Sequence, residues 1–373
     1  MSLKTVKLGE ICLVRRGTTI TKKQTIEGDV PVIGGGTKPT YFHNESNRMA
    51  GCITLSGSGA SAGFVNRWDI PIFASDCSTV EPKDDTQLSK FIYYYLMSQQ
   101  QFIYDNFRSG AAQPHVYSKD IEKLNYPILA IEEQRRIVAK LDTAFAEIDK
   151  SIKIVEEQIV NAKAIFEKSV ISYFSTDKSK SEIKKLSEIA TYFNGLTYSP
   201  KDVGESGTIV LRSSNIQNGR MDFSDIVRVK KNIKEKLYVL PSDILICSRN
   251  GSKALIGKCS LIGKQSEPMT FGTFMMVVRS ESNHYLQWFF QSKLFKQQIA
   301  QGENTAINQI TRYMLDEVIL PVPDISTQIA ISNHLEAIDT QVRELHKIYL
   351  KKINELKALR TSILEQELQS KVA

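Results

Sequence analysis

The chain contains two long stretches in which hydrophobic residues recur at alternating spacings of four and three positions, one within residues 129–175 and one within residues 323–373. This spacing places hydrophobic side chains along one seam of an α-helix and is typical of helices that pair in a coiled coil. Each stretch therefore predicts one helix, on the order of 60–70 Å long at about 1.5 Å per residue. The predicted helix-pairing residues are Leu141, Phe145, Ile148, Ile152, Val155, Ile159, Phe166, Leu335, Ile338, Val342, Leu345, Tyr349, Ile353 and Leu356.

A helix of that length with a single apolar seam is not stable alone in water, so each predicted helix needs a partner. The simplest partner is the other helix, running antiparallel because each helix must return its own domain to the opposite end. An ordinary long hairpin within a globular protein is the alternative. The stripe of the second helix steps by one position around Lys352, which predicts a small phase slip. Asp324 is its predicted N-cap, whereas the first helix has Glu132 and Glu133 in its first turn and no capping residue directly before them.

The segments that precede the two helices have a different pattern. Short apolar runs such as PVIG, GCITLS and DILICS are separated by clusters of Gly, Ser and Asn, which predicts strands joined by loops. Each segment also holds one helical stretch, residues 89–107 and 283–301, in which aromatic residues recur every three to four positions. Such a stripe predicts a buried helix face rather than a base-stacking platform. Each of these two domains is therefore expected to mix helices and strands.

The chain repeats itself once. KLGEICLVRRGTT, from Lys7, aligns with KLSEIATYFNGLT, from Lys185, at an offset of 178 residues, and by Pro127 and Pro321 the offset has grown to 194. A period this long indicates duplicated domains rather than a solenoid. The fold class is thus predicted as α+β, with two mixed domains in tandem, two long antiparallel helices and a pseudo-twofold internal repeat. The predicted ranges are 1–128 and 176–322 for the domains, and 129–175 and 323–373 for the helices.

Composition narrows the possible classes of protein. The chain has 373 residues, of which 42% are hydrophobic, so it can form two cores and is too apolar to be disordered. No apolar run approaches the roughly 20 residues that span a bilayer, and the N-terminus lacks a signal-peptide core, which predicts a cytoplasmic protein with no membrane contact. The five cysteines show no C-x-x-C spacing and are expected to be buried thiols. No metal site is predicted.

The net charge of +7 lies mainly in the segments outside the long helices, which permits nucleic-acid binding and equally permits a solvated basic surface. Matching loops of both copies combine Lys and Arg, which suit phosphates, with Asn, Gln, Ser, Thr and Arg, which can donate to or accept from base edges. For any single residue, a merely solvated loop is an equally good explanation. The last such loop is residues 302–309. The candidate DNA-binding residues are Arg15, Arg16, Thr18, Thr19, Lys22, Lys23, Thr37, Lys38, Tyr41, Ser58, Ser61, Thr197, Tyr198, Lys201, Arg212, Ser213, Asn215, Arg249, Asn250, Ser252 and Lys253.

The motif P-x-x-x-I-E-E-Q-R-R-I-V-A-K-L-D-x-x-F-A-E-I-D, residues 127–149, follows a domain that opens with KLGEI. In this respect the chain resembles the specificity subunit of type I restriction-modification enzymes, and the resemblance covers both copies. Two departures concern only the helix entries. Leu129 and Ala130 stand where the family often has prolines, and Ser326 and Thr327 replace the paired acidic residues.

The resemblance implies a non-catalytic subunit that recognises double-stranded DNA. Each recognition domain would recognise one half of a split target, and the paired helices would set the gap. The outer helix faces would bind two methyltransferase subunits. S-adenosylmethionine would belong to those subunits, and ATP and Mg²⁺ to restriction subunits that act as motor and nuclease. No cofactor would be bound by this chain.

Two other functions remain open from the sequence. Asp69, Glu81 and Lys83 form D-x₁₁-E-P-K, in which two carboxylates could hold Mg²⁺ for a nuclease. A coiled-coil scaffold without any role on DNA is the other. GSKALIGKC, residues 251–259, lacks the spacing and the Ser or Thr of a phosphate loop. Neither N-P-P-Y nor D-P-P-Y occurs, so the usual adenine-methylation motif is absent from the sequence.

Overall fold

A computed structural model describes residues 4–110, 112–175, 181–301 and 309–369. The chain forms two compact units. Unit 1 is Met1–Val155 together with Leu350–Ala373, and unit 2 is Glu156–Tyr349. Each unit therefore contains one of the two mixed domains and part of each long helix.

Unit 1 contains a four-stranded antiparallel sheet of order β2-β8-β5-β6, a three-stranded sheet of order β4-β3-β7 and the pair β1-β9. In the three-stranded sheet, β3 and β7 run parallel. The strands are β1 (Thr5–Lys7), β2 (Cys12–Arg16), β3 (Val30–Ile33), β4 (Tyr41–His43), β5 (Cys52–Ser56), β6 (Val65–Trp68), β7 (Phe73–Ala74), β8 (Cys77–Pro82) and β9 (Asn125–Pro127). The helices are α1 (Leu8–Ile11), α2 (Ser89–Ser98), α3 (Gln100–Phe107), α4 (Ser118–Ile121) and the 3₁₀ turn η1 (Lys22–Gln24).

Unit 2 repeats this frame with a four-stranded sheet of order β11-β20-β17-β18, a second sheet of order β12-β16-β13-β19, the pair β10-β21 and the additional hairpin β14-β15. The strands are β10 (Glu182–Lys185), β11 (Thr191–Asn194), β12 (Val203–Gly204), β13 (Thr208–Leu211), β14 (Ile216–Gln217), β15 (Arg220–Met221), β16 (Val227–Val229), β17 (Ile244–Cys247), β18 (Cys259–Leu261), β19 (Met269–Phe271), β20 (Met275–Arg279) and β21 (Ile319–Val322). The helices are α6 (Leu186–Ile189), α7 (Asn283–Gln291), α8 (Lys293–Gln301), α9 (Arg312–Asp316) and the 3₁₀ turns η2 (Pro200–Asp202), η3 (Ser213–Asn215), η4 (Glu235–Leu237) and η5 (Lys253–Leu255).

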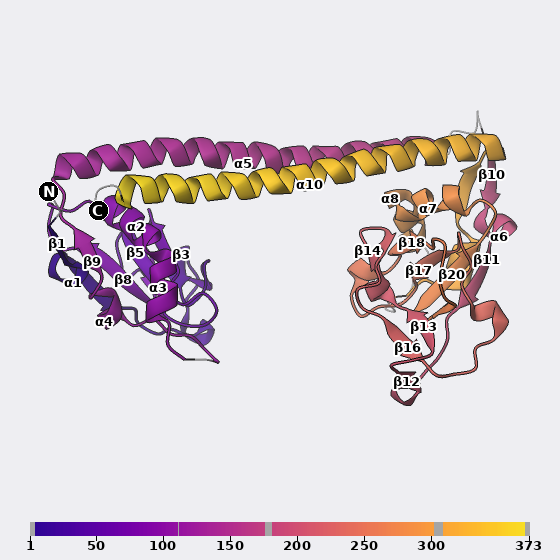
Figure 1. The fold of residues 1–373 in the computed structure, drawn as a ribbon, viewed down its shortest axis with the longest axis horizontal. Coiled ribbons are helices and arrows are strands. Elements are labelled where there is room, and N and C mark those ends of the chain that lie inside the picture. Colours follow the sequence, from indigo (N-terminus) through magenta and orange to yellow (C-terminus); the bar gives the residue numbers. More distant parts are fainter. Residues whose placement is uncertain (1–3, 111, 176–180, 302–308, 370–373) are drawn as a thin grey trace. The chain divides into compact units, whose positions relative to one another are not determined.

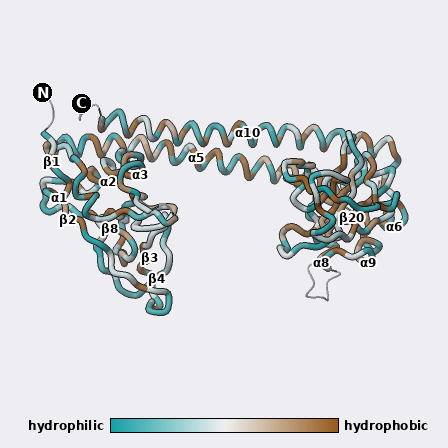
Figure 2. The backbone as a smooth tube through the Cα atoms, turned by 60° about the horizontal axis from the view of Figure 1, so that its bottom comes forward, coloured by the Kyte–Doolittle hydropathy of each residue, from teal (hydrophilic) through white to brown (hydrophobic). Residues whose placement is uncertain are grey.

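The two units use the same packing. In both, the helix pair that follows the four-stranded sheet fills the space between that sheet and the long helices, as the aromatic stripes predicted. Tyr94 of α2 is 4% exposed and Trp288 of α7 is 1% exposed. Figure 2 shows hydrophobic segments gathered around β20 in unit 2 and alternating hydrophilic and hydrophobic positions along the long helices. The predicted α+β class with an internal repeat is confirmed.

The long helices are α5 (Ile131–Phe174) and α10 (Ile325–Gln369), and each is uninterrupted. Within each unit the two lie side by side and antiparallel (Figure 1). Lys140 of α5 pairs with Glu367 of α10 in unit 1, and Tyr173 packs against His334 in unit 2, with ring centroids 5.9 Å apart. The residue numbers add up to 507 in both pairs, so one antiparallel register holds in both units.

Six of the fourteen predicted seam residues are buried: Leu141, Phe145, Ile148, Val155, Leu335 and Ile353. Seven more are partly exposed, but the prediction for Leu345 is wrong. Leu345 is 39% exposed, and the neighbouring His346 is the more buried of the two. A regular spacing of four and three runs through Asp339, Val342, His346, Tyr349, Ile353, Leu356 and Arg360, so the predicted phase slip at Lys352 is also wrong. The polar residues Asp339, His346 and Arg360 occupy three of these seven places, which is why a search for hydrophobic residues alone did not find this seam.

The two helices start differently, as expected. Asp324 Oδ1 accepts a hydrogen bond from the Thr327 backbone N–H at 3.0 Å, which confirms Asp324 as the N-cap of α10. At the start of α5, Ala130 occupies the corresponding place and offers only its backbone carbonyl, to the N–H groups of Glu133 and Gln134.

All five cysteines are buried, as predicted, and none is in a disulfide. Burial raises the pKa of four of these thiols, those of Cys12, Cys52, Cys77 and Cys259, to about 12. None of the helices in the described ranges combines the length and the apolar character that a membrane span requires.

Candidate nucleic-acid interface

Several of the predicted loops of unit 1 meet at one end of its two larger sheets. The Thr18 backbone N–H donates to Ala74 O at 2.9 Å, which fixes the loop after β2 against the end of β7. Ser56 Oγ donates to Gly36 O at 3.0 Å, and this brings the glycine-rich loop after β3 next to the end of β5. Because these loops are tied to strand ends by backbone groups, their side chains are presented from a rigid frame.

The candidate residues of unit 1 differ in how available they are. Arg15 is bonded to Glu81 at 2.7 Å, although its side chain is still 48% exposed. Ser58 donates to Asp76 and is only partly exposed. The exposed candidates are Arg15, Arg16, Thr18, Thr19, Lys22, Lys23, Thr37 and Lys38, and the partly exposed ones are Tyr41, Ser58 and Ser61. Lys22 and Lys23 lie on η1, outside the group of loops that meet at the strand ends.

In unit 2, the corresponding loops also converge. The Leu196 N–H donates to Phe271 O at 2.7 Å, and Asn250 Nδ2 donates to Ser213 Oγ at 3.4 Å. A pocket of about 640 Å³ opens among these loops. Its lining includes three of the candidates, Tyr198, Arg212 and Ser213. The other candidates, Thr197, Lys201, Arg249, Asn250, Ser252 and Lys253, are exposed or partly exposed.

Asn215 does not fit the prediction of a base contact. It is 1% exposed, and its Nδ2 donates to the backbone carbonyls of Asp222 and Asp225 at 3.0 and 2.8 Å. Its Oδ1 accepts from the Arg212 N–H at 2.9 Å. The side chain therefore holds the loop together and has no free group for DNA. An Asn in a polar loop satisfies local backbone groups as readily as a ligand, and sequence does not distinguish these roles.

Two residues near these loops, one in each unit, were not among the candidates. Phe274, between β19 and β20, is 54% exposed and lines the same pocket. Asp76 lies between β7 and β8, and its carboxylate is held by Ser58. Phe274 lies within the apolar run MTFGTFMMVV, residues 269–278, where a hydrophobic residue is expected to be buried. The Gly272-Thr273 pair inside that run was the signal that the strand breaks there.

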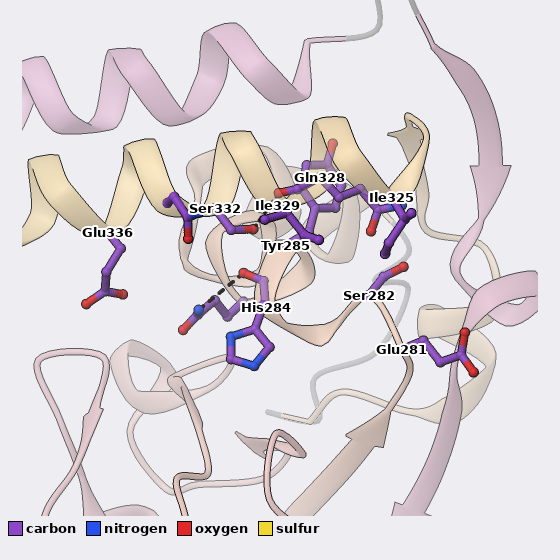
Figure 3. A pocket seen from close by; sticks show the side chains of 11 residues that line it. Glu281, Ser282, His284, Tyr285, Ile325, Gln328, Ile329, Ser332 and Glu336 are labelled. Carbon is purple, nitrogen blue, oxygen red and sulfur yellow. Dashed lines mark hydrogen bonds between the residues drawn. The ribbon is translucent and has the colours of Figure 1, made fainter.

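A further pocket, of about 320 Å³, lies between α7 and the start of α10 (Figure 3). His284 and Tyr285 face it from α7, and Gln328 and Ser332 face it from α10. Two glutamates and no lysine or arginine are among the residues that line it. None of the candidate DNA-binding residues lines this pocket, so it is separate from the candidate interface.

The residues of the predicted nuclease site have separate partners. Asp69 is paired with Arg67, and Glu81 is paired with Arg15 and with Arg48, the latter at 3.4 Å. Lys83 Nζ donates to the backbone carbonyls at the end of α1, at 2.7 and 3.1 Å. Within the part of the chain that the structure describes, no group of three or more His, Cys, Asp or Glu side chains could hold a metal ion.

A protein-family model whose description is "Type I restriction modification DNA specificity domain" matches residues 2–158 and again residues 178–358. The chain belongs to this family. The two matched ranges correspond to the two copies of the internal repeat, so each copy is one specificity domain.

Curated relatives are similar to parts of this chain. The type I restriction enzyme StySPI specificity subunit of Salmonella potsdam is 30% identical over 191 residues, and the EcoKI specificity subunit of Escherichia coli K12 is 30% identical over 171 residues. These matches cover 48% and 43% of this chain, and 40% and 36% of the relatives, less than half of either protein. The MjaVIII specificity subunit of Methanocaldococcus jannaschii is 22% identical over 78% of this chain and 72% of its own length.

Solved structures share the fold of these specificity domains. A chain from a study of complex assembly and conformational transition of the type I R-M system has a TM-score of 0.75 and 18% identity, over 98% of this chain and 97% of that one. The HsdS subunit from Thermoanaerobacter tengcongensis has a TM-score of 0.54 and 16% identity, over 99% and 97% of the two chains. At these identities the likeness shows the fold.

Proposed function

We propose that this chain is the DNA-recognition subunit of a type I restriction-modification complex and has no catalytic activity of its own. Each recognition domain recognises one half of a bipartite target. The observation that carries the proposal is that each of the two matched specificity domains presents a group of basic and polar loops, fixed by hydrogen bonds to strand ends. Two such surfaces on duplicated frames suit two separate half-sites on one duplex.

The paired helices α5 and α10 serve as the spacer and as the binding surface for two methyltransferase subunits. Several large apolar side chains of both helices face away from the seam: Val160 is 65% exposed, Ile165 61%, Ile348 58% and Leu359 48%. Removal of such apolar side chains from water favours association with a partner. Helices of partner subunits that pack against these residues would cover them.

Cofactors belong to the partners in this proposal. The methyltransferase subunits bring S-adenosylmethionine, and the restriction subunits bring ATP and Mg²⁺. What this chain supplies is the position of the DNA relative to those subunits, and we place the complex in the cytoplasm.

The first test measures DNA binding by the purified full-length chain. Phosphate contacts dominate non-specific affinity, so the association constant should fall by roughly 10³–10⁵ between 50 and 200 mM salt if about six to ten phosphates are contacted. Selection from a library of randomised duplexes should enrich one sequence made of two short elements with a fixed gap. A salt-independent affinity, or no enriched sequence, would favour the scaffold.

A second test changes the spacer. One heptad is inserted into both α5 and α10 at facing positions, which preserves the seam. Seven residues add about 10 Å of helix, or roughly three base pairs at about 3.4 Å each. The gap in the enriched sequence should grow by that amount while both elements stay the same. As a control, exchange of residues 1–125 for another recognition domain should change one element only.

The nuclease alternative is tested by incubating the chain with plasmid DNA and Mg²⁺. No cleavage is expected from the wild-type protein. Cleavage that Asp69→Ala abolishes would contradict the assignment of a purely DNA-binding role.

A further inference from the structure

The two recognition domains share one backbone arrangement at the point where their loops meet. In unit 1, the Gly57 N–H donates to Asp76 O at 3.0 Å and the Val116 N–H donates to Gly57 O at 3.1 Å. Ser58, next in the chain, forms an isolated antiparallel bridge with His115. Three separate segments are thus joined at Gly57, and the side chains of Ser58, Asp76 and His115 leave the backbone around it.

Unit 2 contains the same three connections with different residues. The Ser248 N–H donates to Phe274 O at 2.9 Å, and the Ile310 N–H donates to Ser248 O at 2.7 Å. Arg249 forms the isolated bridge with Gln309. Ser58, Asp76 and His115 of unit 1 therefore correspond in position to Arg249, Phe274 and Gln309 of unit 2. The backbone is conserved between the two copies, and the chemistry of the side chains is not.

In unit 1 this backbone arrangement presents a hydrogen-bond acceptor, the carboxylate of Asp76. Ser58 Oγ donates to Asp76 Oδ2, and no described group donates to Oδ1. A Cβ added to Gly57 would lie 2.8 Å from Oδ1, and one added to Gly35 would lie 3.0 Å from Oδ2. The carboxylate is thus held between two glycines that leave room around it. An ionised carboxylate accepts hydrogen bonds only, and the groups of the major groove that donate are the amino groups of cytosine and adenine.

In unit 2 the same backbone arrangement presents a hydrogen-bond donor, the guanidinium group of Arg249. Arg249 Nε donates to Gln309 Oε1 at 3.1 Å, and Nη2 donates to the same oxygen. These bonds use one edge of the guanidinium group and fix its plane, while its carbon lies 6.0 Å from the centre of the Phe274 ring. The terminal edge, formed by Nη1 and the second hydrogen of Nη2, has no partner among the described residues. Two parallel donors in this arrangement match O6 and N7 of guanine.

We propose that Asp76 and Arg249, which belong to the same backbone arrangement in the two recognition domains, each select one base of the target: Asp76 selects a base with an amino group in the major groove, and Arg249 selects guanine. This inference depends on the proposed function, because it assigns a base preference to surfaces that are taken to bind DNA. It also explains how duplicated domains recognise unequal half-sites, since the shared backbone arrangement presents a negative side chain in unit 1 and a positive one in unit 2.

Other arginines near these loops are less suited to this role. Arg15 and Arg212 each donate to a carboxylate, that of Glu81 and of Asp225, both at 2.7 Å. A guanine contact by either would compete with an ion pair that already satisfies the guanidinium group. Arg249 is oriented by a neutral amide, which leaves its charge uncompensated and available to DNA.

The test uses the purified full-length chain and a library of randomised duplexes, with the enriched sequences compared between variants. Arg249→Gln should reduce the preference for guanine at one position of one half-site by roughly 5- to 150-fold, the range for a good bidentate contact, and should leave the other half-site unchanged. The matched control is Lys264→Gln, which removes the same charge from an exposed position of the same unit. This control should lower affinity for all sequences about equally.

Asp76→Asn tests the other half-site. The amide has the shape of the carboxylate but replaces an acceptor by a donor, so the preference for cytosine or adenine should weaken or change at one position. Asp29→Asn, at an exposed position of unit 1, makes the same change of charge and should alter no preference. Thermal unfolding of every variant verifies that the domains remain folded.

The outcomes separate the inference from the function on which it depends. If the wild-type chain enriches a bipartite sequence, and Arg249→Gln and Asp76→Asn only change affinity uniformly, these residues do not select bases and the inference is wrong while the proposed function stands. If the wild-type chain enriches no bipartite sequence, both are wrong.

Discussion

Unit 1 and unit 2 attach a recognition domain to a long helix at matching positions but with different chemistry. In unit 1, Phe145 of α5 packs edge-on against Tyr94 of α2, with ring centroids 5.5 Å apart. The offset of 194 that relates the two helices places Asp339 of α10 at the corresponding position in unit 2. Asp339 is 5% exposed and accepts hydrogen bonds from Arg220 and Arg343, both at 2.7 Å. An aromatic contact in one copy is thus an ionic cluster in the other.

Another pair of matching residues on the long helices, Asp142 and Glu336, also has different hydrogen-bond partners in the two units. Asp142 of α5 accepts from Lys90 Nζ and Tyr94 OH, which both belong to α2. The matching Glu336 of α10 accepts from Arg220, which belongs to the hairpin β14-β15. Burial opposes the charge of Arg220, but its hydrogen bonds to Glu336 and Asp339 outweigh that effect and raise its pKa.

The hairpin that supplies Arg220 has no counterpart among the described residues of unit 1 and accounts for part of the growth in offset from 178 to 194. Asn218 and Gly219 at its turn have φ of 50° and 73°, a conformation that Asn and Gly adopt most readily. Arg343 Nη2 also donates to Asn218 O at 2.7 Å, so the helix binds the turn itself. The comparison indicates that the helix pair was retained after duplication while its attachment to each domain was rebuilt.

The largest expected effect is at the aromatic attachment. Phe145→Ala removes a side chain that is 3% exposed and leaves a cavity against Tyr94, so the free energy of unfolding should fall by about 3–5 kcal/mol. Denaturant unfolding of the full-length chain measures this. Ile154→Ala, on the same helix at a position 46% exposed, should change it by less than about 0.5 kcal/mol. Equal losses from both substitutions would contradict the importance of the aromatic contact.

A second pair of matching residues sharpens the comparison. Gln134 of α5 is 0% exposed, accepts from the Leu88 N–H at 2.9 Å, and donates to three oxygens, among them Thr86 O and Leu129 O. Gln328 of α10 donates to Pro323 O at 2.9 Å, but its Oε1 is buried without a partner in the described structure. The pocket of about 320 Å³ shown in Figure 3 lies beside Gln328.

The two glutamines should therefore differ in what their loss costs. Gln134→Ala leaves several buried backbone groups unpaired and should lower the free energy of unfolding by about 2–3 kcal/mol, whereas Gln328→Ala should lower it by about 1 kcal/mol. Denaturant unfolding of the two variants measures the difference. A larger loss from Gln328→Ala would show that the amide of unit 2 has partners, such as ordered water, that compensate its free acceptor.

The ionic attachment of unit 2 should be weaker and sensitive to salt. Asp339→Ala leaves Arg220 and Arg343 without their shared partner, and because the Arg220 side chain is 41% exposed, solvent reduces the expected loss to about 1–2 kcal/mol. Repeating the measurement in 1 M salt, where the screening length is about 3 Å, should shrink this loss. The loss from Phe145→Ala should not shrink. A salt-independent loss at Asp339 would indicate that packing, rather than charge, holds the hairpin to α10.

Sequence alone could predict the repeated frame, because seam spacing and the duplicated KLGEI and KLSEI openings depend on local pattern. It could not predict the attachments. Asp339 and His346 occupy seam places as polar residues, and Arg220, which binds Asp339, lies on a distant segment. Hydrophobic periodicity therefore selected Leu345 in place of His346.

The candidate interface was predictable only to the level of loops. Lys and Arg in glycine-rich segments indicated the loops that are expected to bind DNA. Most of the candidate DNA-binding residues are exposed. Which side chains remain available to DNA depends on their contacts in the folded chain. The Asn215 side chain is bonded to its own loop, and the Asp76 carboxylate lies beside Gly35 and Gly57, which belong to separate segments. The loop at residues 302–309 lies mostly outside the described residues, of which it contributes only Gln309.

The smallest expected effect is at the helix entries. Asp324 caps α10, and hydrogen bonds from Ser326 and Thr327 hold the pKa of its carboxyl well below the usual range. A group whose pKa is lower in the folded than in the unfolded chain stabilises the fold above its unfolded pKa, about 3.9 for Asp, and this contribution is lost as pH falls toward the folded value. Asp324→Ala should therefore destabilise the chain at pH 7, and its difference from wild type should shrink steadily below about pH 4.

The start of α5 offers the reciprocal experiment, because Ala130 stands where a cap would be. Ala130→Asp would place a carboxylate at the positive end of the helix dipole, next to the N–H groups of the first turn, and should stabilise the chain at pH 7, by less than any of the losses above. Unfolding of both variants between pH 2 and pH 7 measures the two effects. If Ala130→Asp destabilised the chain at pH 7, repulsion by Glu132 and Glu133 in the first turn would outweigh the cap, which would explain why the two helices begin differently.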